Sequence, residues 1–265
     1  MERRFYAVEL AYDGTRFRGF QRQPGLPTVQ DALETALASV GVRAPLAVAA
    51  RTDAGVHALA QVVSFAARAA LDPEALRRGL NAALPDGILA RAVHRVAPSF
   101  HARNSALART YVYLVGLPPP EGLAPYAWTL PDARAFPELH EARLDPDAVR
   151  AALAHAVGTH DFAGFARPGE QRGTVRTLLR ADVVSATWAP LHAIVLEGRG
   201  FLRAMVRNLV GTAVAAGVGV APPATVRELL AARGRYRGVR APGWGLTLAA
   251  VRYAPGTLLP ERPTG

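Results

Sequence analysis

The 265-residue sequence contains no cysteine and no lysine. Without cysteine the chain cannot form disulfides, use a thiolate as a nucleophile or bind zinc through sulfur. No apolar run approaches the roughly eighteen residues of a membrane-spanning helix, and no apolar signal segment follows the N-terminal residues. We therefore expect a cytoplasmic protein that does not enter a membrane.

Because lysine is absent, all 31 basic residues are arginine, and they outweigh 21 acidic residues to give a formal net charge of +10. GC-rich coding can account for arginine in place of lysine, but not for the excess of positive charge. The guanidinium group suits phosphate and stacks on nucleobases, so a phosphate-rich partner is the leading inference. Half of the residues are hydrophobic, which indicates a globular chain with a sizeable core.

Alternating apolar residues and helix caps predict two similar halves. In the first half we expect strands over 5–12, 45–50, 61–66 and 88–95, and helices over 28–40 and 72–84. In the second half we expect strands over 108–115, 177–187, 192–198 and 245–253, and helices over 145–157, 202–216 and 223–232. The order strand, helix, strand, strand, helix, strand is typical of a ferredoxin-like unit.

This repetition predicts an α+β fold in which two ferredoxin-like pseudo-repeats form a mainly antiparallel sheet, with flanking helices and a central active-site cleft. The expected N-terminal half spans 1–106, the C-terminal half spans 107–254, and a tail spans 255–265. The proline-rich segment 117–137 is expected to be a long surface excursion. The tail after Tyr253 is expected to be poorly ordered.

One loop between expected strands, the octapeptide Arg51–Ala58 (RTDAGVHA), combines turn residues with charge. Asp53 followed two residues later by Gly55 is typical of a turn. The octapeptide also carries Arg51 and His57, so the Asp53 carboxylate is held beside a fixed positive charge. Such a charge favours the ionised form of the carboxylate, which a nucleophile requires. On spacing alone, a purely structural Asx turn explains the pattern more simply.

The octapeptide and the QVVSF that follows it resemble the signature of the TruA-type tRNA pseudouridine synthases. Other segments resemble further motifs of that family, in order along nearly the whole chain. These segments are Tyr12–Gln23, Thr28–Gln30, Phe100–Arg103, Arg109–Tyr113, Thr159–Phe162, Phe201–Asn208 and Gly245-Leu246. A chance match of this kind is implausible, although Phe20, Asn104 and Arg203-Ala204 depart from the family pattern and put local RNA contacts in doubt.

The resemblance implies an isomerase that converts uridines 38, 39 and 40 of the tRNA anticodon arm to pseudouridine, acting as a homodimer. It implies Asp53, Tyr111 and Arg207 as catalytic residues. It also implies a substrate-binding set of Tyr111, Leu246, Arg51 and His57. The reaction breaks a ribose–nitrogen bond and forms a ribose–carbon bond without redox chemistry or hydrolysis, so we expect neither a cofactor nor a metal.

The residue pattern leaves simpler interpretations open. Tyr111 and Tyr113 lie on one face of an expected strand, where core packing would explain both. Arg207 lies off the buried stripe of its helix and could be a solvated arginine, and Leu246 could be ordinary core.

Five arginines near these motifs are candidate phosphate contacts that would make RNA binding sensitive to salt. They are Arg16, Arg18, Arg22, Arg103 and Arg109. Individually, each is explained equally well as a surface charge.

Two other functions compete with the synthase: a non-catalytic RNA-binding protein, and a hydrolase that uses Asp53 with His57. A pure binder has no use for an ionised carboxylate among arginines, and a hydrolase would release a base or phosphate from RNA. The sequence has no phosphate-binding G-x-x-x-x-G-K-[ST] loop. His155 and His160 are five residues apart, which fits no familiar zinc pattern.

Overall fold

The computed structural model describes residues 3–139, 141, 143–166, 173–232, 236 and 238–258. They form two compact units: Met1–Arg109 with Leu248–Gly265, and Thr110–Thr247. The C-terminal segment therefore belongs with the first unit. None of the helices in the described ranges is long and apolar enough to cross a membrane.

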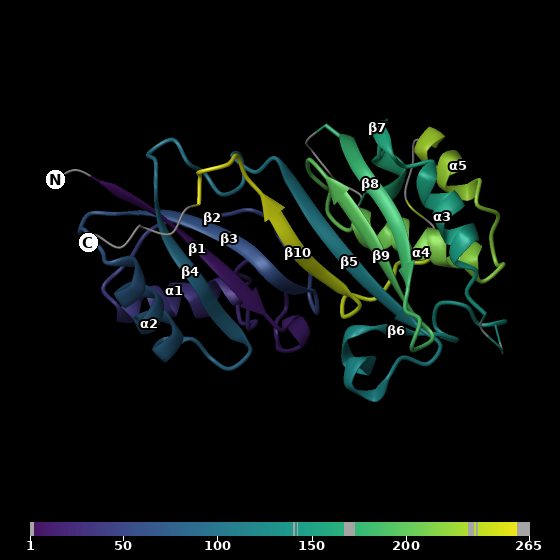
Figure 1. Cartoon of the computed structure of the whole chain (residues 1–265), viewed down its shortest axis with the longest axis horizontal. Coiled ribbons are helices and arrows are strands. Elements are labelled where there is room, and N and C mark those ends of the chain that lie inside the picture. The colour runs from purple at the N-terminus through teal and green to yellow at the C-terminus, as the bar shows by residue number, and fades with distance from the viewer. Residues whose placement is uncertain are drawn as a thin grey trace. The chain divides into compact units, whose positions relative to one another are not determined.

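The first unit is built on a βαββαβ series (Figure 1). Its elements are β1 (Arg4–Tyr12), the 3₁₀ helix η1 (Gly14–Arg16), α1 (Val29–Ser39), β2 (Ala47–Val48), β3 (His57–Ala67), α2 (Pro73–Ala83) and β4 (Ile88–Val96). Strand β1 lies between β3 and β4 and pairs antiparallel with both, and β2 pairs antiparallel with β3. This succession is the ferredoxin-like pattern that the sequence predicts.

The helices of this unit begin where capping residues predict. Thr28 Oγ1 accepts the Asp31 N–H at 3.2 Å at the start of α1. Asp72 Oδ1 accepts the Ala75 N–H at 2.6 Å, and Pro73 occupies the first position of α2. Both helices bury one apolar stripe, as amphipathic surface helices do.

The C-terminal segment packs on a buried cluster of the first unit. Tyr253 contacts Phe100 with a ring-centroid distance of 5.1 Å and donates its hydroxyl to the Ala102 carbonyl at 2.6 Å. Leu258 packs against the same cluster. The part of the expected tail up to Leu258 therefore lies on the unit, and 259–265 lie outside the described residues.

Among its described residues, the second unit combines strands with three α-helices, which Figure 1 shows grouped beside β7, β8 and β9. Its elements are β5 (Ala108–Gly116), η2 (Glu121–Tyr126), β6 (Trp128–Thr129), α3 (Pro146–Ala154), β7 (Gly158–Asp161), η3 (Ala163–Phe165), β8 (Val175–Ser185), β9 (Leu191–Gly198), α4 (Met205–Gly217), α5 (Thr225–Ala231) and β10 (Leu246–Arg252). The first residues of β5 and most of β10 belong to the first unit.

Strand β8 pairs antiparallel with β7 and β9, β9 neighbours β5, and β6 pairs parallel with β5. The expected α+β class, with mostly antiparallel strands and flanking helices, is confirmed.

The proline-rich segment 117–137 is only partly the surface excursion we expected. Trp128 is buried, stacks on Phe136 at 5.7 Å and meets the Tyr113 ring edge-on at 6.3 Å. Its indole N–H donates to Asp132 at 2.8 Å. The segment returns to the core because its aromatic side chains pack beside β5, which turn-forming residues alone did not reveal.

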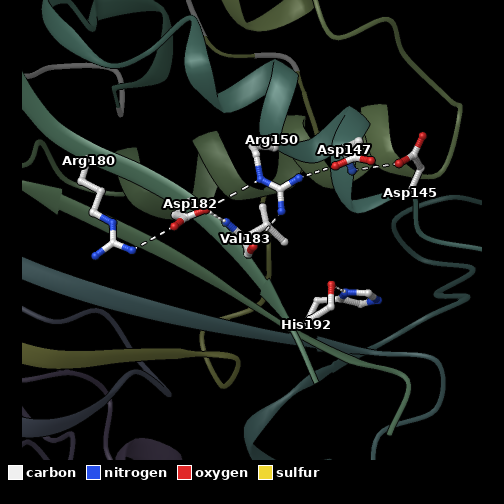
Figure 2. A network of polar contacts seen from close by, with 8 residues as sticks. Asp145, Asp147, Arg150, Arg180, Asp182, Val183 and His192 are labelled. Carbon is white, nitrogen blue, oxygen red and sulfur yellow. Dashed lines mark hydrogen bonds and ion pairs between the residues drawn. The ribbon is translucent and has the colours of Figure 1, made fainter. Parts of the chain in front are cut away.

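An exposed polar network joins α3 to β8 (Figure 2). Arg150 forms an ion pair with Asp147, donates to the Val183 carbonyl at 2.9 Å and lies 3.7 Å from Asp182. Arg180 also donates to Asp182, at 2.9 Å. This hydrogen bond is the main cause that lowers the pKa of Asp182 below its ordinary value.

Candidate active site

Asp53 lies in the loop between β2 and β3 and is half-buried. The loop makes the tight turn that its Asp-x-Gly spacing predicts, since the Val56 N–H donates to the Asp53 carbonyl at 3.2 Å and Gly55 has φ +76°. The turn therefore holds the backbone of the carboxylate residue in a defined conformation at the start of β3.

A second loop, which follows β1, interlocks with this turn. The Phe20 N–H donates to the Thr52 carbonyl at 3.0 Å, and the Gly55 N–H donates to the Phe17 carbonyl at 3.3 Å. Gly19 has φ +97°, and a Cβ there would lie 2.9 Å from the Thr52 oxygen. This close backbone approach explains why glycine occupies position 19, within the segment Tyr12–Gln23.

His57 fastens the same two loops together. It is buried, and its Nδ1 accepts the Gly14 N–H at 3.1 Å while lying 3.2 Å from Asp13 Oδ1. An ion pair with Asp13 would need a proton on Nδ1, but the Gly14 N–H points at that nitrogen, so we assign the proton to Nε2. A Cβ at Gly14 would lie 2.1 Å from the Val56 carbonyl oxygen, so glycine is required there as well. The substrate-binding role expected for His57 stays a prediction beside this structural one.

The candidate RNA-binding arginines fall into three situations. The side chains in the first group are exposed, and this group is Arg16, Arg18 and Arg103; Arg51, expected in the substrate-binding set, is exposed as well. Arg22 is exposed too, but it forms ion pairs with Asp31 and Glu34. Because these carboxylates balance its charge, the attraction of Arg22 for phosphate is reduced.

Arg109 is in the third situation, because it is only 7% exposed. Its guanidinium donates to the Ala49 carbonyl from Nε at 3.2 Å and from Nη2 at 3.0 Å. It also donates to the Arg103 carbonyl at 2.6 Å and the Ala106 carbonyl at 3.2 Å. The predicted phosphate contact of Arg109 therefore competes with a structural role that the sequence pattern did not suggest.

In the second unit, β5 carries the two tyrosines that the sequence could not separate. The Tyr113 hydroxyl donates to the Pro242 carbonyl at 3.0 Å, and burial raises its pKa well above the ordinary value. Tyr111 instead meets the Phe201 ring edge-on at 5.3 Å. Tyr113 thus holds the segment before β10 in place, while the roles predicted for Tyr111 stay predictions.

Arg207 lies on α4 and is half-buried rather than fully solvated. Its Nε donates to the Ala241 carbonyl at 2.7 Å, and the Ala241 N–H donates to the Arg207 carbonyl at 3.1 Å. A Cβ at Gly211 would lie 1.9 Å from the Val239 carbonyl oxygen, so glycine permits this close approach to α4. Leu246, at the start of β10, is buried in the same unit.

Asn208 is a residue that the sequence analysis did not single out. Its side chain is fully buried, donates to the Phe165 carbonyl at 2.7 Å and accepts from Arg240 Nε at 2.9 Å. The available signal was an amide directly after Arg207 in a segment that is otherwise mostly apolar, where a buried polar group needs partners. Asn208 therefore links α4 to η3 and to the segment before β10.

The described ranges contain no group of three or more His, Asp or Glu side chains that could hold a metal ion. In the first unit, the half-buried carboxylate of Asp53 lies on a loop fixed by two glycine contacts. In the second unit, Tyr111 lies within β5, Arg207 lies in the first turn of α4, and Leu246 is the first residue of β10.

Known proteins are similar in sequence to this chain over nearly its whole length. The sequence profile of a family described as tRNA pseudouridine synthase matches residues 10–103 and 152–254. The chain belongs to this family. It is an isomerase that forms pseudouridine in tRNA.

Several named relatives cover almost the whole chain. The chain is 42% identical over 261 residues to tRNA pseudouridine synthase A of Chloroflexus aurantiacus, covering 96% of this chain and 91% of the relative. It is 37% identical over 254 residues to the Streptococcus thermophilus protein of that name, covering 94% and 98%. It is 40% identical over 267 residues to the Neisseria gonorrhoeae protein of that name, covering 97% and 96%.

Proposed function

We propose that this enzyme isomerises uridines 38, 39 and 40 in the anticodon arm of tRNA, with Asp53 as the nucleophile. The observation that carries the proposal is the half-buried Asp53 carboxylate on a turn that the loop after β1 holds through backbone hydrogen bonds. A nucleophile benefits from such fixation because a misplacement of about 1 Å can cost roughly a hundredfold in rate.

In the proposed reaction, the Asp53 carboxylate attacks either the uracil ring or the ribose carbon, and the bond from ribose to the base nitrogen breaks. The base then turns, a bond forms from ribose to the ring carbon, and the bond to Asp53 breaks so that the carboxylate is regenerated. The proton on that carbon is removed, and the freed ring nitrogen gains one. Tyr111 stacks on the base and takes part in removing this proton, Arg207 is the third catalytic residue, and Leu246 contacts the uracil. The target base must leave its stack before these steps.

The substrate fits the charge of the chain, which is +10. The exposed arginines Arg16, Arg18 and Arg103 contact phosphates in this proposal, and Arg51 and His57 belong to the substrate-binding set. Their contribution weakens as salt rises, because phosphate contacts release counterions. We further propose a cytoplasmic homodimer in which one tRNA contacts both subunits.

The test is single-turnover reaction with unmodified tRNA, followed by mapping of pseudouridine at each uridine. For Asp53→Asn we expect a rate at least about a thousandfold below wild type, with tRNA affinity retained, because asparagine keeps the turn but not the nucleophile. Asp72→Asn is the matched control, because asparagine also caps α2 and the rate should not change.

A rate for Asp53→Asn within tenfold of wild type would contradict the nucleophile assignment. Pseudouridine found only at uridines outside the anticodon arm would contradict the proposed positions. Release of free uracil or phosphate would favour the hydrolase instead.

A further inference from the structure

Three buried polar side chains form a continuous hydrogen-bonded chain behind the Asp53 loop. Tyr12 on β1 is 5% exposed, Gln61 on β3 is 0% exposed, and Thr52 in the loop is 7% exposed. The Tyr12 hydroxyl lies 2.7 Å from Thr52 Oγ1, and Gln61 Nε2 donates to the Tyr12 oxygen at 3.2 Å. The chain ends one residue before Asp53.

The direction of these bonds follows from the donors available. Gln61 Nε2 can only donate, so the Tyr12 oxygen accepts from it. Burial raises the pKa of Tyr12 to about 12, so its hydroxyl keeps its proton. The Tyr12 hydroxyl therefore donates this proton to Thr52 Oγ1 in the loop.

Gln61 also holds the loop directly. Its Oε1 accepts the Ala50 N–H at 3.2 Å, and its Nε2 donates to the Ala50 carbonyl at 2.7 Å. The carboxamide thus satisfies both backbone groups of Ala50, as a neighbouring strand would. Arg109 holds the preceding carbonyl, that of Ala49. Residues 49, 50 and 52 are therefore each fixed by a buried side chain.

We propose that Tyr12, Gln61 and Thr52 are positioning residues that set the orientation of the Asp53 carboxylate for the isomerisation. The inference rests on the proposed nucleophilic role of Asp53. Catalytic groups need supporting contacts that keep them within about 0.5 Å of the productive geometry. Here the support acts through the backbone that leads into the residue, and the hydrogen-bonded hydroxyl of Thr52 is its last member.

The decisive variants remove single hydroxyls and keep the shape of the side chain. Tyr12→Phe and Thr52→Val each delete one end of the 2.7 Å bond, whereas Thr52→Ser keeps a hydroxyl in place. We expect the single-turnover rate to fall roughly tenfold for Tyr12→Phe and for Thr52→Val, from a displacement of a fraction of an ångström. Thr52→Ser should stay within about twofold of wild type, and tRNA affinity should not change.

Tyr6 offers a matched control on the same strand. It is fully buried, and its hydroxyl accepts the Leu71 N–H at 2.7 Å and donates to the Leu71 carbonyl at 3.3 Å. Tyr6→Phe should lower the unfolding midpoint in urea about as much as Tyr12→Phe does, but leave the reaction rate unchanged. Equal effects of the two variants on rate would show that Tyr12 acts through stability alone.

A double variant tests whether the two hydroxyls act as one unit. Because Tyr12→Phe and Thr52→Val break the same bond, together they should slow the reaction by little more than either alone. Multiplied effects, or rates near wild type for both single variants while Asp53→Asn is inactive, would overturn the positioning role. Full activity of Asp53→Asn would instead remove the proposed nucleophile, a result that these hydroxyl variants cannot produce.

Discussion

Two arginines, one in each unit, make a similar number of polar contacts in opposite surroundings. Arg109 is buried and donates to the carbonyls of Ala49, Arg103 and Ala106. Arg150 is 45% exposed in its side chain and contacts two carboxylates and one carbonyl, as Figure 2 shows. The first arginine organises the chain behind a proposed catalytic loop, and the second ties a helix to a strand at the surface.

The difference shows that burial, more than the number of contacts, sets what an arginine contributes. Water competes for the contacts of Arg150 and salt screens its charge, so its ion pairs are weak. The guanidinium of Arg109 is largely shielded from both, and the carbonyl of the buried Ala49 would lose two hydrogen bonds from a charged donor. Since the chain has no lysine, one residue type performs both tasks, and composition cannot separate them.

The largest effect should come from Arg109→Met, which keeps much of the aliphatic volume but removes the donors. We expect a loss of about 3 kcal/mol in the free energy of unfolding, because the Ala49, Arg103 and Ala106 carbonyls lose charge-assisted hydrogen bonds, those to Ala49 being buried. Urea unfolding measures it, with Arg103→Met as the exposed control from the same segment. Equal urea midpoints for Arg109→Met and Arg103→Met would contradict the conclusion that burial sets what an arginine contributes to stability.

The sequence predicted the parts of the fold that depend on local patterns. Thr28 and Asp72 are the helix caps that were expected, and alternation located β1 and β4 closely. It placed the start of β3 four residues late, at 61 rather than His57. The reason is that the octapeptide Arg51–Ala58 was assigned to a loop, whereas its last two residues, His57 and Ala58, already belong to β3.

The candidate site was less predictable, because its polar partners are distant in the sequence. The Asp-x-Gly turn at Asp53 follows from local chemistry. The bond between Tyr12 and Thr52, by contrast, joins residues 40 positions apart, and the Arg109 bond to the Ala49 carbonyl spans 60. Sequence periodicity reports which face a residue occupies, but it does not report which backbone group lies opposite.

A second prediction tests whether burial of a polar side chain has the same effect on stability in the second unit as in the first. Asn208 is fully buried in the second unit and links the Phe165 carbonyl to Arg240. Asn208→Ala should cost about 2 kcal/mol, because it leaves both partners unsatisfied. The exposed Asn104 provides the control, and Asn104→Ala should change stability by less than about 0.5 kcal/mol. Stability of Asn208→Ala near that of the control would confine the burial effect to the first unit.

A third prediction uses pH to examine a half-buried pair. Glu9 lies 2.8 Å from His94 Nε2, and this hydrogen bond is the main cause that lowers the pKa of Glu9 below its ordinary value of 4.5. The unfolded chain therefore takes up this proton first as pH falls. The stabilisation is complete above about pH 4.5 and is lost as pH falls through the lower folded pKa.

Glu9→Gln should accordingly be less stable than wild type by about 1 kcal/mol at about pH 6, and the gap should shrink at about pH 3. Urea midpoints at both values measure this. A gap that stays constant with pH would show that the carboxylate contributes through packing and not through its charge.

The smallest effect should come from Arg150→Ala. Its partners Asp147 and Asp182 are 86% and 35% exposed in their side chains, so water replaces the lost contacts. We expect a loss below about 1 kcal/mol at low salt. The loss should decrease further in about 1 M sodium chloride, where the screening length falls to about 3 Å. Repeating the Arg109→Met measurement in the same salt completes the comparison, because its buried bonds to carbonyls should be nearly insensitive to salt. A salt-independent loss for Arg150→Ala as large as that for Arg109→Met would contradict this. It would mean that the hydrogen bond to the Val183 carbonyl, and not the exposed ion pairs, stabilises this network.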